Sequence, residues 1–217
     1  MFKELINAYK IISYGLAIKR QMAFAIAFLL IGIALDAVTK GAQPTGGFYI
    51  VLSGMFIYQL IISSDVSTLI QSSPYKKKIQ CTYPLLATVP WIFIAFTIVA
   101  VMHWFFAKNG DTEQIAEQGR IILTIGAFVF ICLIYFGLVY KYFLISTICM
   151  VFTISPCTLI FMGVIRKHYA LFENYWLCVA IVYGLLIVGT VISWYLSKLV
   201  YKKDMSKAAF KMMMKKG

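Results

Sequence analysis

Apolar stretches recur along this chain, and each is long enough to cross a bilayer as a helix of about 20 residues. Hydrophobic residues make up 62% of the 217 positions, whereas they make up about 45–50% of a soluble domain. Most of the charged residues lie in short segments between the apolar stretches. The pattern predicts an all-α polytopic membrane protein.

Six of the apolar stretches are predicted to span the membrane. Their approximate limits are Gln21–Val38, Phe48–Ile70, Tyr83–Phe106, Arg120–Tyr140, Tyr142–Val164 and Tyr175–Val200. An even number of spans places both termini on the same side of the membrane. We therefore expect a single transmembrane domain over residues 1–217, with the six spans inside residues 21–200.

The distribution of basic residues predicts that both termini are cytoplasmic. In that orientation fifteen of the twenty Lys and Arg residues lie inside and five lie outside, as the positive-inside rule requires. The same rule accounts for the formal net charge of +12, and no soluble module is left that could bind nucleic acid. We expect a multi-pass protein of a bacterial plasma membrane.

Both ends of the chain are predicted to lie at the inner membrane surface. Residues 1–20 have apolar residues at helical spacing and charged residues on another face, which is typical of an amphipathic interfacial helix. This helix either anchors the chain to the membrane or also contacts a cytoplasmic partner. Residues 201–217 form a basic tail whose lysines recur at every fourth position, which favours contact with anionic lipid headgroups.

The sequence lacks the residue groupings that catalysis inside a membrane needs. It has no phosphate-binding loop, no HExxH motif, no CxxC pair and no cluster of carboxylates. We therefore expect no catalytic residue, no metal site, no cofactor bound by this chain and no enzymatic activity of its own. The five cysteines are interpreted as buried thiols. His103, which precedes Trp104, is interpreted as an anchor at the outer membrane interface.

Polar residues inside the predicted spans give candidates for a translocation path. Asp65 lies near the inner third of the second span, and Asp36 lies near the outer end of the first. Because a charge in the membrane is costly, such residues face protein or water. With Ser64 and Thr68 beside it, Asp65 is either a lining residue of a polar vestibule, or a structural hydrogen-bonding centre or interfacial side chain. Pro156 predicts a bend in the fifth span, packed against neighbours or beside a cavity.

A compact basic segment, QSSPYKKKIQCTYP at residues 71–84, lies between the second and third predicted spans. Ser72 or Ser73 could cap a short helix with Pro74 in its first turn. Pro84 would then separate this helix from the third span. The segment is either an orientation signal, for which positive charge suffices, or a short transverse helix that inserts into a cytoplasmic subunit.

The layout of the chain resembles the permease subunits of ABC-2-type exporters, and among them the small permeases of Gram-positive peptide exporters of the phenol-soluble modulin kind. The resemblance rests on the amphipathic start, the six spans with both ends inside, and the motif SSPYKKKIQCTYPLL after the second span. In that family this segment holds a coupling helix that inserts into a cleft of the ATPase subunit. The coupling residues implied are Ser73, Pro74, Tyr75, Lys76, Lys77 and Lys78. The outer loop between the fifth and sixth spans is shorter than in many members of the family.

The resemblance also implies partners and a cargo. It implies a cytoplasmic ATPase subunit that holds ATP and Mg, a second copy of this chain or a related permease, and membrane lipids. The implied function is the outward movement of an amphipathic or hydrophobic substrate, a peptide first of all. Two alternatives stay open, namely a haem- or lipid-exporting permease and a non-transporting membrane protein such as an assembly factor or sensor.

Overall fold

A computed structural model of the chain describes residues 2–12, 18–64, 74–108, 110–163, 174–204 and 206–207. These residues form helices joined by turns, and none of them lies in a β-strand. The helices are α1 (Phe2–Ile12), α2 (Ile18–Val38), α3 (Thr45–Ser64), α5 (Lys76–Cys81), α6 (Tyr83–Ala107), α7 (Thr112–Leu138), α8 (Phe143–Gly163) and α9 (Tyr175–Val200). For this part of the chain the prediction of an all-α fold is confirmed.

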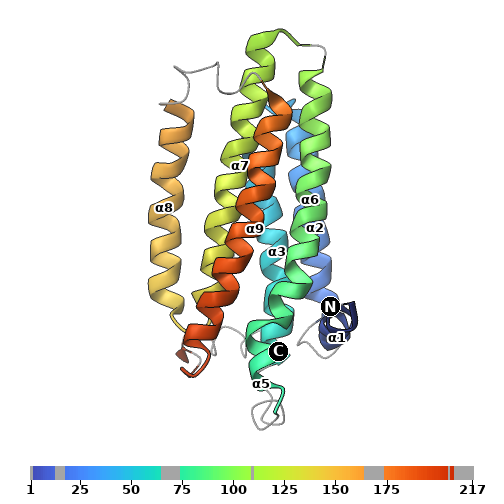
Figure 1. Cartoon of the computed structure of the whole chain (residues 1–217). Coiled ribbons are helices and arrows are strands. Elements are labelled where there is room, and N and C mark those ends of the chain that lie inside the picture. Colours follow the sequence, from blue (N-terminus) through green and yellow to red (C-terminus); the bar gives the residue numbers. More distant parts are fainter. Residues whose placement is uncertain are drawn as a thin grey trace.

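The long helices run side by side as a bundle (Figure 1). Within the described residues, five of them are long and apolar enough to cross a membrane, namely α2, α3, α6, α7 and α9. The predicted fifth span corresponds to α8, a helix of 21 residues that is also apolar. These helices are those of a multi-pass α-helical membrane protein, and the number of six spans stays a prediction.

The two ends of the bundle differ in what they carry. Helices α1 and α5 and the last turns of α9 lie at one end (Figure 1), which we call the α5 end. The last turn of α6 and the first turn of α7, which carries Glu113, lie at the opposite end, which we call the α6–α7 end. The predicted cytoplasmic side corresponds to the α5 end, and the orientation in the membrane stays a prediction.

Helix α7 packs closely against α9. A Cβ atom added at Gly126 would lie 2.4 Å from the Val182 side chain, and one added at Gly137 would lie 2.8 Å from the Ser193 carbonyl oxygen. Small residues allow helix backbones to approach in this way inside a membrane. The stretch Phe128–Ile134 also packs inward, because four of its residues are buried, namely Phe128, Val129, Cys132 and Leu133.

Helix α8 lies on the flank of α7 (Figure 1), and most of its described large apolar side chains are exposed on the single chain. Pro156 lies inside this helix. Its side chain is exposed rather than packed against neighbouring helices. Within the described residues, Pro156 is therefore not buried against a neighbouring helix, and the expected bend stays a prediction.

The short helix α5 differs in detail from the helix predicted in the basic segment. It begins at Lys76, its N-cap residue is Tyr75, and no side chain caps it, so the expected serine cap is wrong for this helix. Pro74 precedes the helix instead of lying in its first turn. Pro84 does not separate α5 from α6. It lies in the first turn of α6, where a proline is tolerated because its missing N–H has no partner in the helix.

The described cysteines are free thiols, and the prediction that they are buried is confirmed for three of them and wrong for the fourth. Cys81, Cys132 and Cys178 are buried, whereas Cys149 on α8 is exposed on the single chain. The side chain of Cys157 lies outside the described residues.

Candidate functional site

The basic helix α5 is held to the bundle by one face and exposes the other. Ile79, Gln80 and Cys81 are buried, and the Cys81 thiol donates a hydrogen bond to the carbonyl oxygen of Ser197 on α9, at 3.4 Å. Tyr75, at the start of the helix, is 60% exposed. Only Thr82 lies between α5 and α6. The helix therefore forms a short extension of α6 with an aromatic and basic outer face.

Two of the three consecutive lysines contact other helices at the α5 end. The Lys78 ammonium group forms an ion pair with Glu4 of α1, at 2.8 Å, and the Tyr83 hydroxyl donates a hydrogen bond to the other oxygen of Glu4, also at 2.8 Å. These hydrogen bonds, that of Lys78 first, hold the pKa of the Glu4 carboxyl below its ordinary value. The Lys77 ammonium lies 5.2 Å from the ring centre of Tyr201, which follows α9, a cation–π distance. The lysines thus connect α5 to α1 and to the end of α9.

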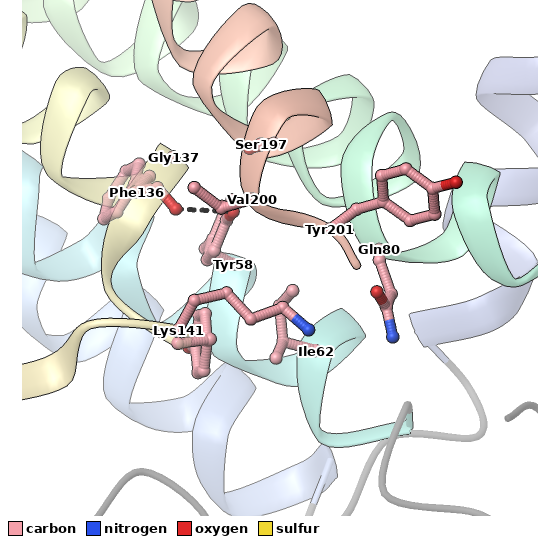
Figure 2. Close-up of a pocket in the computed structure, with 10 residues that line it drawn as sticks. Tyr58, Ile62, Gln80, Phe136, Gly137, Lys141, Ser197, Val200 and Tyr201 are labelled. Atoms are coloured by element: carbon pink, nitrogen blue, oxygen red, sulfur yellow. Dashed lines mark hydrogen bonds between the residues drawn. The ribbon is translucent and has the colours of Figure 1, made fainter. Parts of the chain in front are cut away.

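A small cavity lies behind α5 (Figure 2). Its volume of about 20 Å³ is enough for roughly one water molecule. The Tyr58 hydroxyl donates a hydrogen bond to the Phe136 carbonyl oxygen at 2.7 Å, drawn as a dashed line in Figure 2. The Tyr58 ring stacks on Phe136 and on Tyr140. The cavity lies between α5 and the helices α3, α7 and α9. It is lined by Tyr58, Ile62, Gln80, Phe136, Gly137, Tyr140, Lys141, Ser197, Val200 and Tyr201.

The other sequence-predicted site residues are only partly described. Asp65 and Thr68 of the expected vestibule, and Ser73 of the expected coupling helix, lie outside the described residues. Ser64 is the last residue of α3, and its side chain is not described. Ser63, one residue earlier, is buried, and its hydroxyl donates to the carbonyl oxygen of Leu60 at 2.7 Å. The vestibule therefore stays a prediction.

A buried polar cluster at the α6–α7 end was not predicted from the sequence. Asp36 of α2 and His103 of α6 are both 0% exposed, and Asp36 Oδ2 lies 3.5 Å from His103 Nε2. His103 Nδ1 lies 2.6 Å from Gln118 Oε1 on α7. The interpretation of His103 as an interface anchor is therefore wrong, because its ring is enclosed by protein.

Two glycines, one in the turn after α2 and one in the first turn of α3, make room for this cluster. Gly41, at φ +67°, ends the turn after α2, and its N–H donates to the Asp36 carbonyl oxygen at 2.9 Å. This left-handed conformation favours glycine. The Gly46 N–H donates to Asp36 Oδ1 at 3.0 Å, and a Cβ atom at Gly46 would lie only 1.7 Å from Asp36 Oδ2.

The signal for this cluster was present in the sequence but weak. Asp36 and His103 both lie near the outer ends of their predicted spans and therefore at a similar depth in the membrane. Many other pairs of residues at span ends share a depth, so this does not single out the pair. Their separation of 67 positions leaves no local motif. Only the packing of α2, α6 and α7 brings the two side chains together.

Comparisons of the chain with known protein families, with curated proteins and with solved structures found no match.

Proposed function

We propose that this chain is the transmembrane subunit of an ATP-driven exporter of the ABC-2 type. The observation that carries the proposal is helix α5, a short surface helix after α3 that extends α6 and exposes Tyr75 and Lys77. A separate ATPase subunit would bind this face and would hold ATP and Mg. The chain would supply no catalytic residue and would move an amphipathic or hydrophobic cargo, a peptide first of all.

The contacts of α5 support a mechanical role. A displacement of its outer face would act directly on α6, on α1 through the Lys78–Glu4 ion pair and on α9 through the Cys81–Ser197 hydrogen bond. An ATPase subunit can shift the chain between two conformations only if it binds one of them more tightly than the other. The ATP-dependent change in the ATPase cleft would provide that difference.

The transport path would be completed by a second permease, either another copy of this chain or a related one. The exposed apolar side chains of α8 are compatible with a partner helix as well as with lipid, because both are apolar surroundings. Haem and lipid stay open as alternative cargoes. The contrasting hypothesis is a membrane assembly factor or sensor whose lysines only orient the chain.

The test compares two pairs of exposed residues. The variants Tyr75→Ala and Lys77→Ala change the outer face of α5. Tyr195→Ala on α9 is the matched aromatic control, since Tyr195 is 59% exposed, and Lys108→Ala is the basic control at the opposite end of the bundle. Each tagged variant is purified in mild detergent from its native membranes, and vanadate-sensitive ATP hydrolysis is measured in the purified fraction.

The coupling hypothesis expects the ATPase to be lost only from the α5 variants. Removal of a central aromatic anchor costs about 2 kcal/mol, which is about a 30-fold loss of affinity. If α5 serves only as an orientation signal, Tyr75→Ala retains as much ATPase activity as Tyr195→Ala. On this orientation-signal hypothesis, a variant with the three lysines moved by two positions also retains the ATPase activity. If no vanadate-sensitive hydrolysis accompanies the wild-type chain, the exporter hypothesis itself is wrong.

A further inference from the structure

Asp36 and His103 have no role in the proposed coupling of α5 to an ATPase, because they lie at the other end of the bundle. Their facing atoms, Asp36 Oδ2 and His103 Nε2, are buried, and neither atom has a hydrogen-bond partner among the described residues. We propose that these two side chains form a proton-binding site, in which one shared proton joins α2 to α6. The inference does not depend on the exporter function.

The hydrogen bonds of Gln118 determine which nitrogen of His103 carries a fixed hydrogen. The Gly41 carbonyl oxygen can only accept, so the Gln118 amide nitrogen must face it, at 3.3 Å. The Gln118 side-chain oxygen then faces His103 Nδ1, at 2.6 Å, and can only accept. Nδ1 therefore carries a hydrogen, and Nε2 is the nitrogen that faces Asp36 Oδ2.

The arrangement of Nε2 and the carboxylate requires a proton between them. Asp36 Oδ1 already accepts from the Gly46 N–H. Without a further proton, Asp36 Oδ2 and His103 Nε2 present lone pairs to each other at 3.5 Å in a buried site. Such a contact is repulsive, and both atoms have lost their hydration. One proton, on either the imidazole or the carboxyl, gives one atom a donor and the other an acceptor.

A proton fits this site better than a metal ion or a larger ligand. The site is closely packed, since a Cβ atom at Gly41 would lie 2.8 Å from Gln118 Oε1 and one at Gly46 would lie 1.7 Å from Asp36 Oδ2. The described residues contain no group of three His, Cys, Asp or Glu side chains that could hold a metal ion. The Gly46 N–H also points its positive end at the carboxylate, which disfavours a cation there.

No other charged side chain among the described residues pairs with Asp36 or His103 in place of the proton. Helix α3 carries no charged residue, and Lys40 after α2 and Lys108 after α6 are exposed. On α7, Arg120 is buried and pairs with Glu117 at 3.3 Å, and Glu113 is exposed, as is Asp111 before the helix. Among the described residues, no ion pair joins any of these groups to Asp36 or His103 other than the Asp36–His103 pair itself.

The proton-binding site would hold together four helices. Asp36 contacts α3 through Gly46 and α6 through His103, and His103 contacts α7 through Gln118. Loss of the proton would leave repulsion at the centre of this junction. The occupancy of the site would therefore control how firmly the α6–α7 end is closed.

The first test measures thermal unfolding of the purified chain in detergent between about pH 5 and pH 9. A histidine in an unfolded chain loses its proton near pH 6.5. If the folded chain keeps one proton above that pH, its folding equilibrium constant falls up to tenfold for each pH unit, until the site itself deprotonates. In Asp36→Asn the amide can donate to Nε2 without an added proton, so this fall should disappear while the chain still folds.

The matched control is Glu117→Gln, which removes a carboxylate at the same end of the bundle but outside the cluster. Its pH profile should follow that of the wild type. Equal pH profiles for wild type and Asp36→Asn would overturn the proposal.

The second test uses nitrogen-15 NMR of labelled histidine side chains, and it does not depend on stability. The chain has two histidines, so the His168→Gln variant leaves the His103 signals alone. We expect Nδ1 of His103 to keep its hydrogen across the pH range and Nε2 to change, with Asp36→Asn altering the pH of that change. A neutral His103 with its hydrogen on Nε2 and a bare Nδ1 would contradict the proposed network.

Discussion

At the residue scale, Glu4 illustrates how one carboxylate joins helices that are distant in the sequence. It accepts from Lys78 of α5 and from Tyr83 of α6, while it belongs to α1. An exposed ion pair alone contributes little to stability. Here, however, the carboxylate has a second donor, so its removal affects the positions of two helices relative to α1.

The Glu4 contact is expected to depend on pH in the acid range. Because the folded chain lowers the pKa of Glu4, its contribution is fully present above the ordinary glutamate pKa of about 4.3. It is lost as the pH falls through the lowered value. A double-mutant cycle of Glu4→Gln and Lys78→Gln, followed by thermal unfolding, should show coupling at neutral pH and none well below pH 4. Equal coupling at both pH values would contradict the observed contact.

At the element scale, the close crossing of α7 and α9 depends on glycines. Gly137 faces the backbone of α9, since a Cβ atom there would lie 2.8 Å from the Ser193 carbonyl oxygen. A backbone atom cannot turn away as a flexible side chain can. Gly184 on α9 provides the contrast, because a Cβ atom there would meet nothing within 4 Å.

Gly137→Ala is expected to destabilise the chain by about 1–3 kcal/mol, which is typical of overpacking a close contact. Gly184→Ala adds the same methyl group in open space, so it should leave stability unchanged or raise it slightly. Thermal unfolding of the two variants in the same detergent measures the difference. If both variants unfold at the same temperature as the wild type, α7 and α9 do not cross as closely as described.

At the scale of the whole molecule, the bundle has a polar junction at each end. The α5 end has lysines that contact α1 and α9, and the α6–α7 end has the Asp36–His103–Gln118 cluster. Between them lies an apolar core that includes Phe96, Ile121 and Leu186. If the chain is the exporter subunit proposed above and opens alternately to the two sides, contacts at both ends must break, and these two junctions are the candidates.

Orientation in the membrane can be tested by cysteine labelling from outside the cell. Single cysteines are placed at Lys76 and Glu113 in a background without Cys149, whose side chain is exposed. The excess of basic residues on the α5 side predicts that a membrane-impermeant maleimide reaches position 113 and not position 76. Labelling at position 76 from outside would reverse the predicted topology, and permeabilised cells serve as the control for reactivity.

The positions of three spanning helices along the chain follow from the sequence alone. The predicted spans Gln21–Val38, Tyr83–Phe106 and Tyr175–Val200 agree within a few residues with α2, α6 and α9. The physical reason is that the bilayer sets the length of an apolar helix, so length and composition suffice. Residues 76–81 were likewise recognisable as a basic helix, although its cap and its junction with α6 were predicted wrongly.

Which side of each helix faces the protein depends on how the helices pack together. On α6, Phe96 is 0% exposed and Ile94 is 61% exposed, yet both are apolar. Lipid is as apolar as the protein interior, so hydrophobic periodicity does not distinguish the two sides of a spanning helix. For the same reason the sequence did not show that Asp36 meets His103, since their contact follows from the packing of α2, α6 and α7 and not from any spacing along the chain.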